Sequence, residues 1–297
     1  MIELFAESPL VFVAVVFAFC LIIGSFLNVV IYRLPIMMER DWREQCEEML
    51  KTPPERKIPE ERFDLVVPHS SCPSCGAAIK AWQNIPVISY LLLGGKCSEC
   101  RESISARYPV VELLTGLLAA TCAWHFGFGW EALMAIVLTL MLFPIAMIDA
   151  DTMYIPDSIV LPMLWIGLAM SVFAPVEGAE VLFVAPQDAI VGAIAGYLSL
   201  WSIYHLFKLF TGKEGMGYGD FKLLAALCAW LGWQHLHVII LMSAVVAALV
   251  GIALMVIRKH GREIPIPFGP YLAAAGWITM LWGDVIQKAY IDRFLAG

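Results

Sequence analysis

Apolar residues fall into long uninterrupted runs in this chain, and polar stretches rich in Gly and Pro separate the runs. A helix needs roughly 20 apolar residues to cross the hydrocarbon core of a bilayer, which is about 30 Å thick. Eight runs approach or exceed that length: Leu10–Tyr32, Pro109–Phe126, Trp130–Ile148, Ser158–Phe173, Ala189–Phe210, Phe221–Gln234, Leu236–Ile257 and Phe268–Ile286. The pattern predicts an all-α polytopic membrane protein with about eight transmembrane helices.

The composition strengthens this prediction. Hydrophobic residues make up 60% of the chain and charged residues only 15%. Such a composition excludes a soluble globular domain of this size, and lipid must be the main solvent. The net charge of -7 and the absence of a basic cluster argue against nucleic acid as a partner. The first seven residues are acidic, so we expect the first run to be a retained span, since a cleaved secretory signal begins with basic residues.

The basic residues predict the orientation of the spans. The segment from Arg33 to Arg107 carries eleven of the nineteen Lys and Arg residues, so we expect it to be cytoplasmic. Alternation of the spans then places three more segments on that side: Asp149–Asp157, Lys208–Asp220 and Arg258–Pro267. Lys288 and Arg293 break the pattern after eight spans. Either the last helix does not cross the membrane, or these two residues are a tolerated exception.

These assignments divide the chain into three parts. Residues 1–33 form the first span, residues 34–108 form a cytoplasmic loop, and residues 109–297 form a membrane domain of seven spans. Within the loop, Glu39–Leu50 has mixed charges at helical spacing and is expected to form a solvated or membrane-skimming amphipathic helix. The sixth span is short, and the polar run Gly212–Asp220 precedes it. Irregular backbone at membrane depth requires surrounding protein or water, so this run is a candidate lining of a site.

Four cysteines of the loop form two Cys-x-x-Cys pairs, Cys72 with Cys75 and Cys97 with Cys100, separated by 21 residues. This spacing is typical of a zinc ribbon, in which one tetrahedral metal ion joins both pairs. Two disulfides are the alternative, but the charge distribution places these thiols on the reducing cytoplasmic side. We predict a structural Zn2+ held by all four thiolates, since four protein ligands leave the metal no open position for catalysis.

Carboxylates near a membrane surface are costly, so each one is a candidate functional group. Asp149 ends the third run, and Asp220 begins the sixth, directly after Gly217 and Gly219. Peptide hydrolysis needs a base that activates water and an acid that protonates the leaving nitrogen. Two neighbouring Asp side chains that share one proton supply both. The two glycines would let a substrate strand approach without Cβ clashes, which makes Gly217 and Gly219 candidate substrate-binding residues.

Structural roles for the acidic residues stay open at this point. Asp149 could simply end a helix at the interface, and Asp220 could cap the first turn of the sixth span. Asp157, which follows Pro156, is expected to cap the fourth span. Asp151 is expected to be solvated.

Six motifs spread over nearly the whole chain resemble those of the type IV prepilin peptidases. They are Gly24–Pro35, the paired cysteine motifs around Trp82–Tyr90, Arg107–Glu112, Ile148–Asp157, Gly217–Leu223 and Pro267–Pro270. The resemblance implies that Asp149 and Asp220 are the two catalytic aspartates of an intramembrane aspartyl endopeptidase. Asp149 lies seven residues before Pro156, as in the family, and Asp220 ends a Gly-x-Gly-Asp motif.

The resemblance also implies the substrates and the location. Type IV prepilins and type II secretion pseudopilins are expected to be cut at the cytoplasmic face of the bacterial inner membrane, after a Gly that precedes an apolar helix. Many members then methylate the new N-terminal amine with S-adenosylmethionine. The sequence has no Gly-rich nucleotide-binding fingerprint for this methyl donor, so methylation rests on the resemblance alone.

Two other classes of protein compete with this interpretation. A proton-coupled transporter also uses intramembrane carboxylates and spans broken by Gly and Pro. Internal repeats would favour a transporter, but the two halves of this chain differ in charge, cysteine content and motifs. A zinc-bearing membrane scaffold without chemistry is the third class, and it gives no reason for two glycines before a buried Asp.

Overall fold

The computed structural model describes residues 5, 7–50, 62–173, 184–258 and 266–294. Helices account for nearly all of the regular structure, and within the described residues the only β-type pairs are two isolated bridges, Ser71 with Ala78 and Lys96 with Ser103. The elements are α2 (Pro9–Leu50), η1 (Ala81–Asn84), α3 (Ile88–Leu92), α4 (Arg107–Phe126), α5 (Trp130–Thr152), α6 (Asp157–Phe173), α7 (Pro186–Thr211), α8 (Tyr218–Leu231), η2 (Trp233–His235), α9 (Leu236–Arg258) and α10 (Gly269–Phe294).

Each predicted apolar run contains a helix, which confirms an all-α polytopic fold. Within the described ranges, five helices are long and apolar enough to cross a membrane: α2, α4, α5, α7 and α9 together with η2. Helix α6 is apolar but shorter, and α8 has 14 residues. The count of eight spans therefore stays a prediction. Two stretches between the predicted runs lie outside the described residues. They are residues 259–265 of the segment Arg258–Pro267, and residues 174–183, where a turn near Glu177 is expected between the fourth and fifth runs.

The chain forms two compact units, residues 1–124 and residues 125–297. In the first unit, α2 is one continuous helix of 42 residues, and it includes the helix that was expected at Glu39–Leu50. It continues from the first predicted span because Pro35 removes one backbone hydrogen bond without stopping the helix, and the following residues are good helix formers. An ion pair between Glu39 and Arg43, one turn apart, supports this polar extension.

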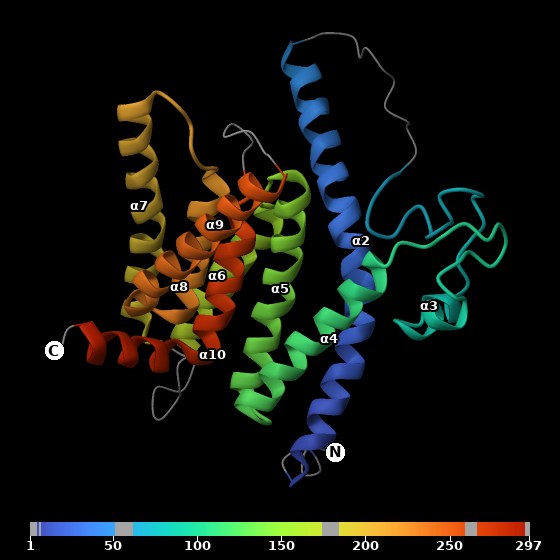
Figure 1. Ribbon diagram of the computed structural model, residues 1–297, viewed down its shortest axis with the longest axis horizontal. Helices are drawn as coiled ribbons and strands as arrows, with labels where there is room; N and C mark the ends of the chain where they lie inside the picture. Colours follow the sequence, from blue (N-terminus) through green and yellow to red (C-terminus); the bar gives the residue numbers. More distant parts are fainter. Residues whose placement is uncertain (1–4, 6, 51–61, 174–183, 259–265, 295–297) are drawn as a thin grey trace. The chain divides into compact units, whose positions relative to one another are not determined.

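Helix α4 crosses α2 within the first unit (Figure 1). The two backbones approach so closely at Gly24 that an added Cβ would lie 2.8 Å from the Cα atom of Glu112. Only glycine fits this crossing point. Further along the chain, the buried guanidinium of Arg33 donates to the carbonyl oxygens of Asp64 at 2.9 Å and Pro68 at 2.6 Å, so the segment before the cysteines is attached to α2.

Helix α8 is the centre of the second unit. It packs against α6, α7 and α10, and every residue from Phe221 to Leu231 except Lys222 is buried. Gly192 and Gly196 of α7 lie directly on its backbone, where an added Cβ would come within 2.4 Å of the Cys228 oxygen and 2.9 Å of the Leu224 oxygen. Because protein surrounds α8, its short length exposes little backbone to lipid.

Helix α10 bends at Trp282, whose φ of -133° leaves the helical region. Figure 1 shows the part after the bend turning away from the axis of the first part. Lys288 and Arg293, the two basic residues that broke the charge pattern, both lie in this second part. The regular part of the predicted last span therefore ends at the bend, earlier than the predicted boundary at Ile286.

Candidate functional site

Asp149 lies in the last turn of α5 and is 4% exposed. The helix ends just after it, where Met153 adopts a left-handed conformation and donates its N–H to the Asp149 carbonyl at 2.8 Å. The carboxylate is held from another part of the chain, because its Oδ2 accepts the backbone N–H of Gly269 at 2.9 Å. The end of α5 and the start of α10 thus meet at this side chain.

Asp220 lies in the first turn of α8 and is 7% exposed. Its Oδ2 accepts the backbone N–H of Gly217 at 3.2 Å, so the side chain does satisfy one of the free donors at the helix start, as the capping interpretation expected. Its Oδ1 is buried and has no hydrogen-bond partner among the described residues. A buried polar atom without a partner is rare and calls for a water or a ligand.

The two carboxylates are near neighbours, close enough for the charge of Asp149 to act on Asp220. Ile155, in the turn after α5, packs against Gly219, which precedes Asp220, and against Gly269, which donates to Asp149. An added Cβ on Gly219 would lie 2.8 Å from the Cβ of Ile155, and one on Gly269 would lie 3.0 Å from its Cδ1. The Gly269 position is tighter still, since its Cβ would come within 2.7 Å of the Asp149 Oδ2.

The two glycines proposed to bind substrate have different surroundings. An added Cβ on Gly217 would meet nothing closer than the Asp220 Oδ2, at 3.7 Å, so the backbone there is open on that side. At Gly219 the equivalent space is filled by Ile155, which gives this glycine a packing role. Sequence reasoning missed Ile155 and Gly269, although the Pro267–Pro270 motif already marked the position of Gly269.

Asp157 is not an isolated cap of α6. It is the first residue of that helix, and both of its carboxylate oxygens accept from the ammonium of Lys222, at 2.7 and 2.8 Å. Lys222 lies near the start of α8, two residues after Asp220. The ion pair therefore joins the starts of α6 and α8. Asp151 is exposed, as expected.

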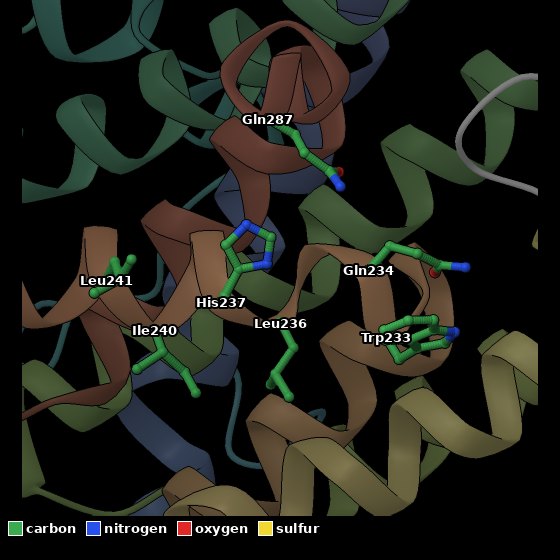
Figure 2. A pocket seen from close by; sticks show the side chains of 7 residues that line it. All are labelled: Trp233, Gln234, Leu236, His237, Ile240, Leu241 and Gln287. Atoms are coloured by element: carbon green, nitrogen blue, oxygen red, sulfur yellow. The ribbon is translucent and has the colours of Figure 1, made fainter. Parts of the chain in front are cut away.

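A cavity of about 570 Å³ lies elsewhere in the second unit, at η2, the start of α9 and the second part of α10. Figure 2 shows its lining, which consists of Trp233, Gln234, Leu236, His237, Ile240, Leu241 and Gln287. The lining has no carboxylate and therefore offers no acid and base pair. Asp149 and Asp220 do not line this cavity.

The four cysteine thiols of the first unit come together as the spacing predicted. The Sγ atoms of Cys72, Cys75, Cys97 and Cys100 all lie within 4.8 Å of one another. Two similar turns produce this arrangement, because the Cys72 N–H donates to Ala77 at 2.9 Å and the Cys97 N–H donates to Glu102 at 2.8 Å. The residue after each second cysteine has a positive φ, 71° at Gly76 and 63° at Arg101.

The geometry of the thiols fits a tetrahedral metal ion. Zn–S bonds of about 2.3 Å place the sulfur atoms of a tetrahedron about 3.8 Å apart. The Sγ atoms of Cys72 and Cys100 are 3.8 Å apart. Backbone N–H groups of Cys75 and Ser74 lower the pKa of the Cys72 thiol to about 6, whereas desolvation and the three neighbouring thiols raise the pKa of Cys100 to about 12. A bound cation would favour the thiolate form of all four. The donor set of four sulfurs favours zinc.

Comparison with known proteins matches both units of the chain. Residues 18–126 match the family model for the bacterial peptidase A24 N-terminal domain, and residues 136–252 match that for the type IV leader peptidase family. A prepilin leader peptidase/N-methyltransferase of Stutzerimonas stutzeri is 53% identical over 98% of both chains. The chain belongs to the type IV leader peptidase family. A protein of the same name from Pseudomonas aeruginosa is 51% identical over 98% of both chains. Another from Neisseria gonorrhoeae is 47% identical over 91% of this chain and 90% of its own.

Membership of the type IV leader peptidase family confirms that the chain is an enzyme and a peptidase, as the motifs indicated. It also supports a multi-pass protein of the inner membrane. The two matched regions separate the candidate groups, since the four cysteines lie in the first region and Asp149 and Asp220 lie in the second. No solved structure matches the chain significantly.

Proposed function

We propose that this chain is an aspartyl endopeptidase that removes the leader from type IV prepilins and type II secretion pseudopilins and then methylates the new N-terminus. The observation that carries the proposal is the pair of buried carboxylates, Asp149 and Asp220, each of which accepts one backbone N–H. The names of the relatives supply the substrate class and the second activity.

Hydrogen bonding suggests a division of labour between the two carboxylates. The N–H of Gly269 favours negative charge on Asp149, so we assign this residue as the base that takes a proton from the attacking water. The buried Oδ1 of Asp220 has no donor among the described residues, and it therefore carries the proton that the leaving nitrogen receives. The C–N bond breaks as this proton is transferred, and the peptide hydrolyses into an acid and an amine.

The substrate must reach the pair as an extended strand, because helical backbone shields the carbonyl that water attacks. The open side of Gly217 offers space for such a strand. The run Gly212–Gly219 has four glycines, and its N–H and C=O groups can pair with the strand by β-addition. Gly219 contributes by letting Ile155 pack closely. We place this site at the cytoplasmic face, on the side of the basic loop.

Methylation transfers a methyl group from the sulfonium of S-adenosylmethionine to the free amine. An N–C bond forms as the S–C bond breaks, the donor becomes a thioether, and the amine loses a proton. We assign this step to the first unit, since the carboxylate site is built wholly from residues of the second. Cys72, Cys75, Cys97 and Cys100 would hold Zn2+ there as a structural ion, which neutralises crowded thiolates and stabilises a loop with little core.

The experiment uses the purified full-length protein in lipid or detergent, a prepilin and a labelled methyl donor. It reports cleavage by the change in substrate mass and methylation by the label. We expect both products from the wild type, with the label on the new N-terminal residue only. Intact prepilin after incubation with folded, zinc-loaded protein would overturn the proposal.

A further inference from the structure

Glu112 is a buried carboxylate that the peptidase site does not use. It lies in α4, one and a half turns from the helix start, and is 8% exposed. The Cα of Glu112 is also the atom against which Gly24 packs, so the side chain leaves α4 where this helix crosses α2. A carboxylate at such a position is costly unless it performs a task.

The task is visible in its hydrogen bond. The Oε2 atom of Glu112 accepts the backbone N–H of Val87 at 2.8 Å. Val87 has a φ of 60° and a ψ of -48°, and the carbonyl of Pro86 accepts the N–H of Ile88 at 2.5 Å across it. This is a γ-turn of the rare, strained hand, and a β-branched residue at its centre is a conformational outlier. Such strain persists only where surrounding groups hold it.

The segment that Glu112 holds is part of the cysteine region. η1 and α3 lie on either side of Val87, and the side chain of Gln83 in η1 donates to the Ser98 hydroxyl at 2.8 Å, between Cys97 and Cys100. The hydroxyl of Ser25 in α2 donates to the side-chain oxygen of Asn84, the last residue of η1, at 3.4 Å. Glu112 and Ser25 thus connect the backbone next to the second cysteine pair with both helices of the crossing.

We infer that Glu112 is a positioning residue for methyl transfer, because its hydrogen bond with the Val87 N–H fixes the cysteine region at the crossing of α2 and α4. This inference rests on the proposed function. The peptidase groups give no role to Glu112, since Asp149, Asp220 and the N–H groups that hold them all lie in the second unit. Loss of this hydrogen bond therefore slows methylation and leaves cleavage unchanged.

The test compares Glu112→Ala with Glu112→Gln, which keeps an acceptor oxygen for the Val87 N–H. Each is also combined with Val87→Gly, because glycine adopts a positive φ without strain and needs less restraint. Cleavage of a prepilin and methylation of the cut product are measured separately on protein of matched zinc content. Hydrogen exchange of the backbone amides in residues 84–92 reports how firmly this segment is held, independently of any activity.

We expect Glu112→Ala to lower the methylation rate by about tenfold or more, the effect of losing one hydrogen bond to a charged group. Cleavage should stay within about twofold of the wild type, and exchange over residues 84–92 should accelerate. Glu112→Gln should retain most methylation. Adding Val87→Gly to Glu112→Ala should restore part of it, which a merely structural loss of the helix crossing would not allow.

Three results would overturn the inference. The first is equal loss of cleavage and methylation in Glu112→Ala, the second is wild-type methylation in that variant, and the third is unchanged exchange over residues 84–92. The proposed function is judged by the wild-type arm of the same assay. If the wild type cuts and methylates but Glu112→Ala does so equally well, only the inference fails.

Discussion

The carboxylate site and the cysteine module are held together by different means. Asp149 and Asp220 are fixed by buried helices, by backbone N–H groups and by glycines that allow close packing. The cysteine module, residues 70–104, has only short helical turns and two isolated bridges, and most of its residues are exposed or half-buried. The first arrangement is held by packed helices, whereas the second brings four thiols together with little core around them.

This difference indicates how each region responds to change. A site built on packed helices should be sensitive to volume, because close-packed interiors do not absorb an added methyl group. A module with little core should be sensitive to its metal ligands, because metal binding supplies its folding free energy. Variants that act on volume and on ligands therefore test whether the two regions are independent.

Apart from changes to the two aspartates, the largest effect is expected from the double variant Cys72→Ser, Cys75→Ser. It should lose the zinc ion that elemental analysis of the wild type should find at one per chain. Limited proteolysis should then cut residues 70–104 readily, and methylation should fall by more than about a hundredfold, because the module loses the metal that supplies its folding free energy. Cys122→Ser, a change at a buried cysteine outside the module, serves as the control and should keep its zinc. No zinc in the wild type, together with unchanged proteolysis of the double variant, would refute the metal site.

A smaller effect is expected from Gly269→Ala. The new Cβ would lie 2.7 Å from the Asp149 Oδ2, so the carboxylate must move. Overpacking of this kind costs about 1–3 kcal/mol, and if this cost falls on the transition state, kcat for cleavage falls by about five- to 150-fold. Gly217→Ala is the comparison, because its Cβ meets open space and should raise KM for the prepilin more than it lowers kcat. Equal kinetics in the two variants would contradict the packing account.

A modest effect is expected from Lys222→Met, which breaks the ion pair with Asp157. Both partners are partly exposed, so the pair contributes only about 0–1 kcal/mol to stability, and cleavage should fall by less than about threefold. Asp157→Asn should retain most activity, since the amide oxygen still accepts from Lys222. A loss of a hundredfold in either variant would show that this pair belongs to the catalytic machinery.

The smallest effect is expected where the two cysteine turns differ. Arg101 adopts a φ of 63° that glycine adopts more easily, and Gly76 has this conformation in the matching turn. Gly76→Ala should weaken the module by about 1 kcal/mol, because alanine adopts this positive φ less readily than glycine. Nothing lies within 4 Å of the added Cβ, so no clash increases this cost. Arg101→Gly should strengthen it slightly. Competition for zinc with a chelator measures both, and the two changes should have opposite signs.

The sequence predicted the features that depend on local composition. Apolar runs located the helices, the cysteine spacing located a cluster that the structure assembles, and the motifs marked Asp149 and Asp220, which are both buried. The contacts that hold these groups were not predictable, because they join distant parts of the chain. Gly269 and Asp149 are 120 residues apart, and only the packing of α10 on α5 brings them together.

The N-terminal region shows a second limit of sequence reasoning. A fall in hydrophobicity after Tyr32 marks where lipid contact should end, but the helix continues through Pro35, because hydropathy does not report helix continuity. The hydrogen bond from Val87 to Glu112 was equally hidden. A Glu in an apolar run indicates a functional or structural role, but the sequence does not show which group it contacts.

The most direct test of the central claim is the pair of variants Asp149→Asn and Asp220→Asn, assayed with intact prepilin and, separately, with a product that has already been cut. The account predicts that each variant loses cleavage by more than about a thousandfold, because one missing carboxylate removes half of a shared acid and base function. Each should still methylate the cut product at close to the wild-type rate. Normal cleavage by either variant would contradict the account.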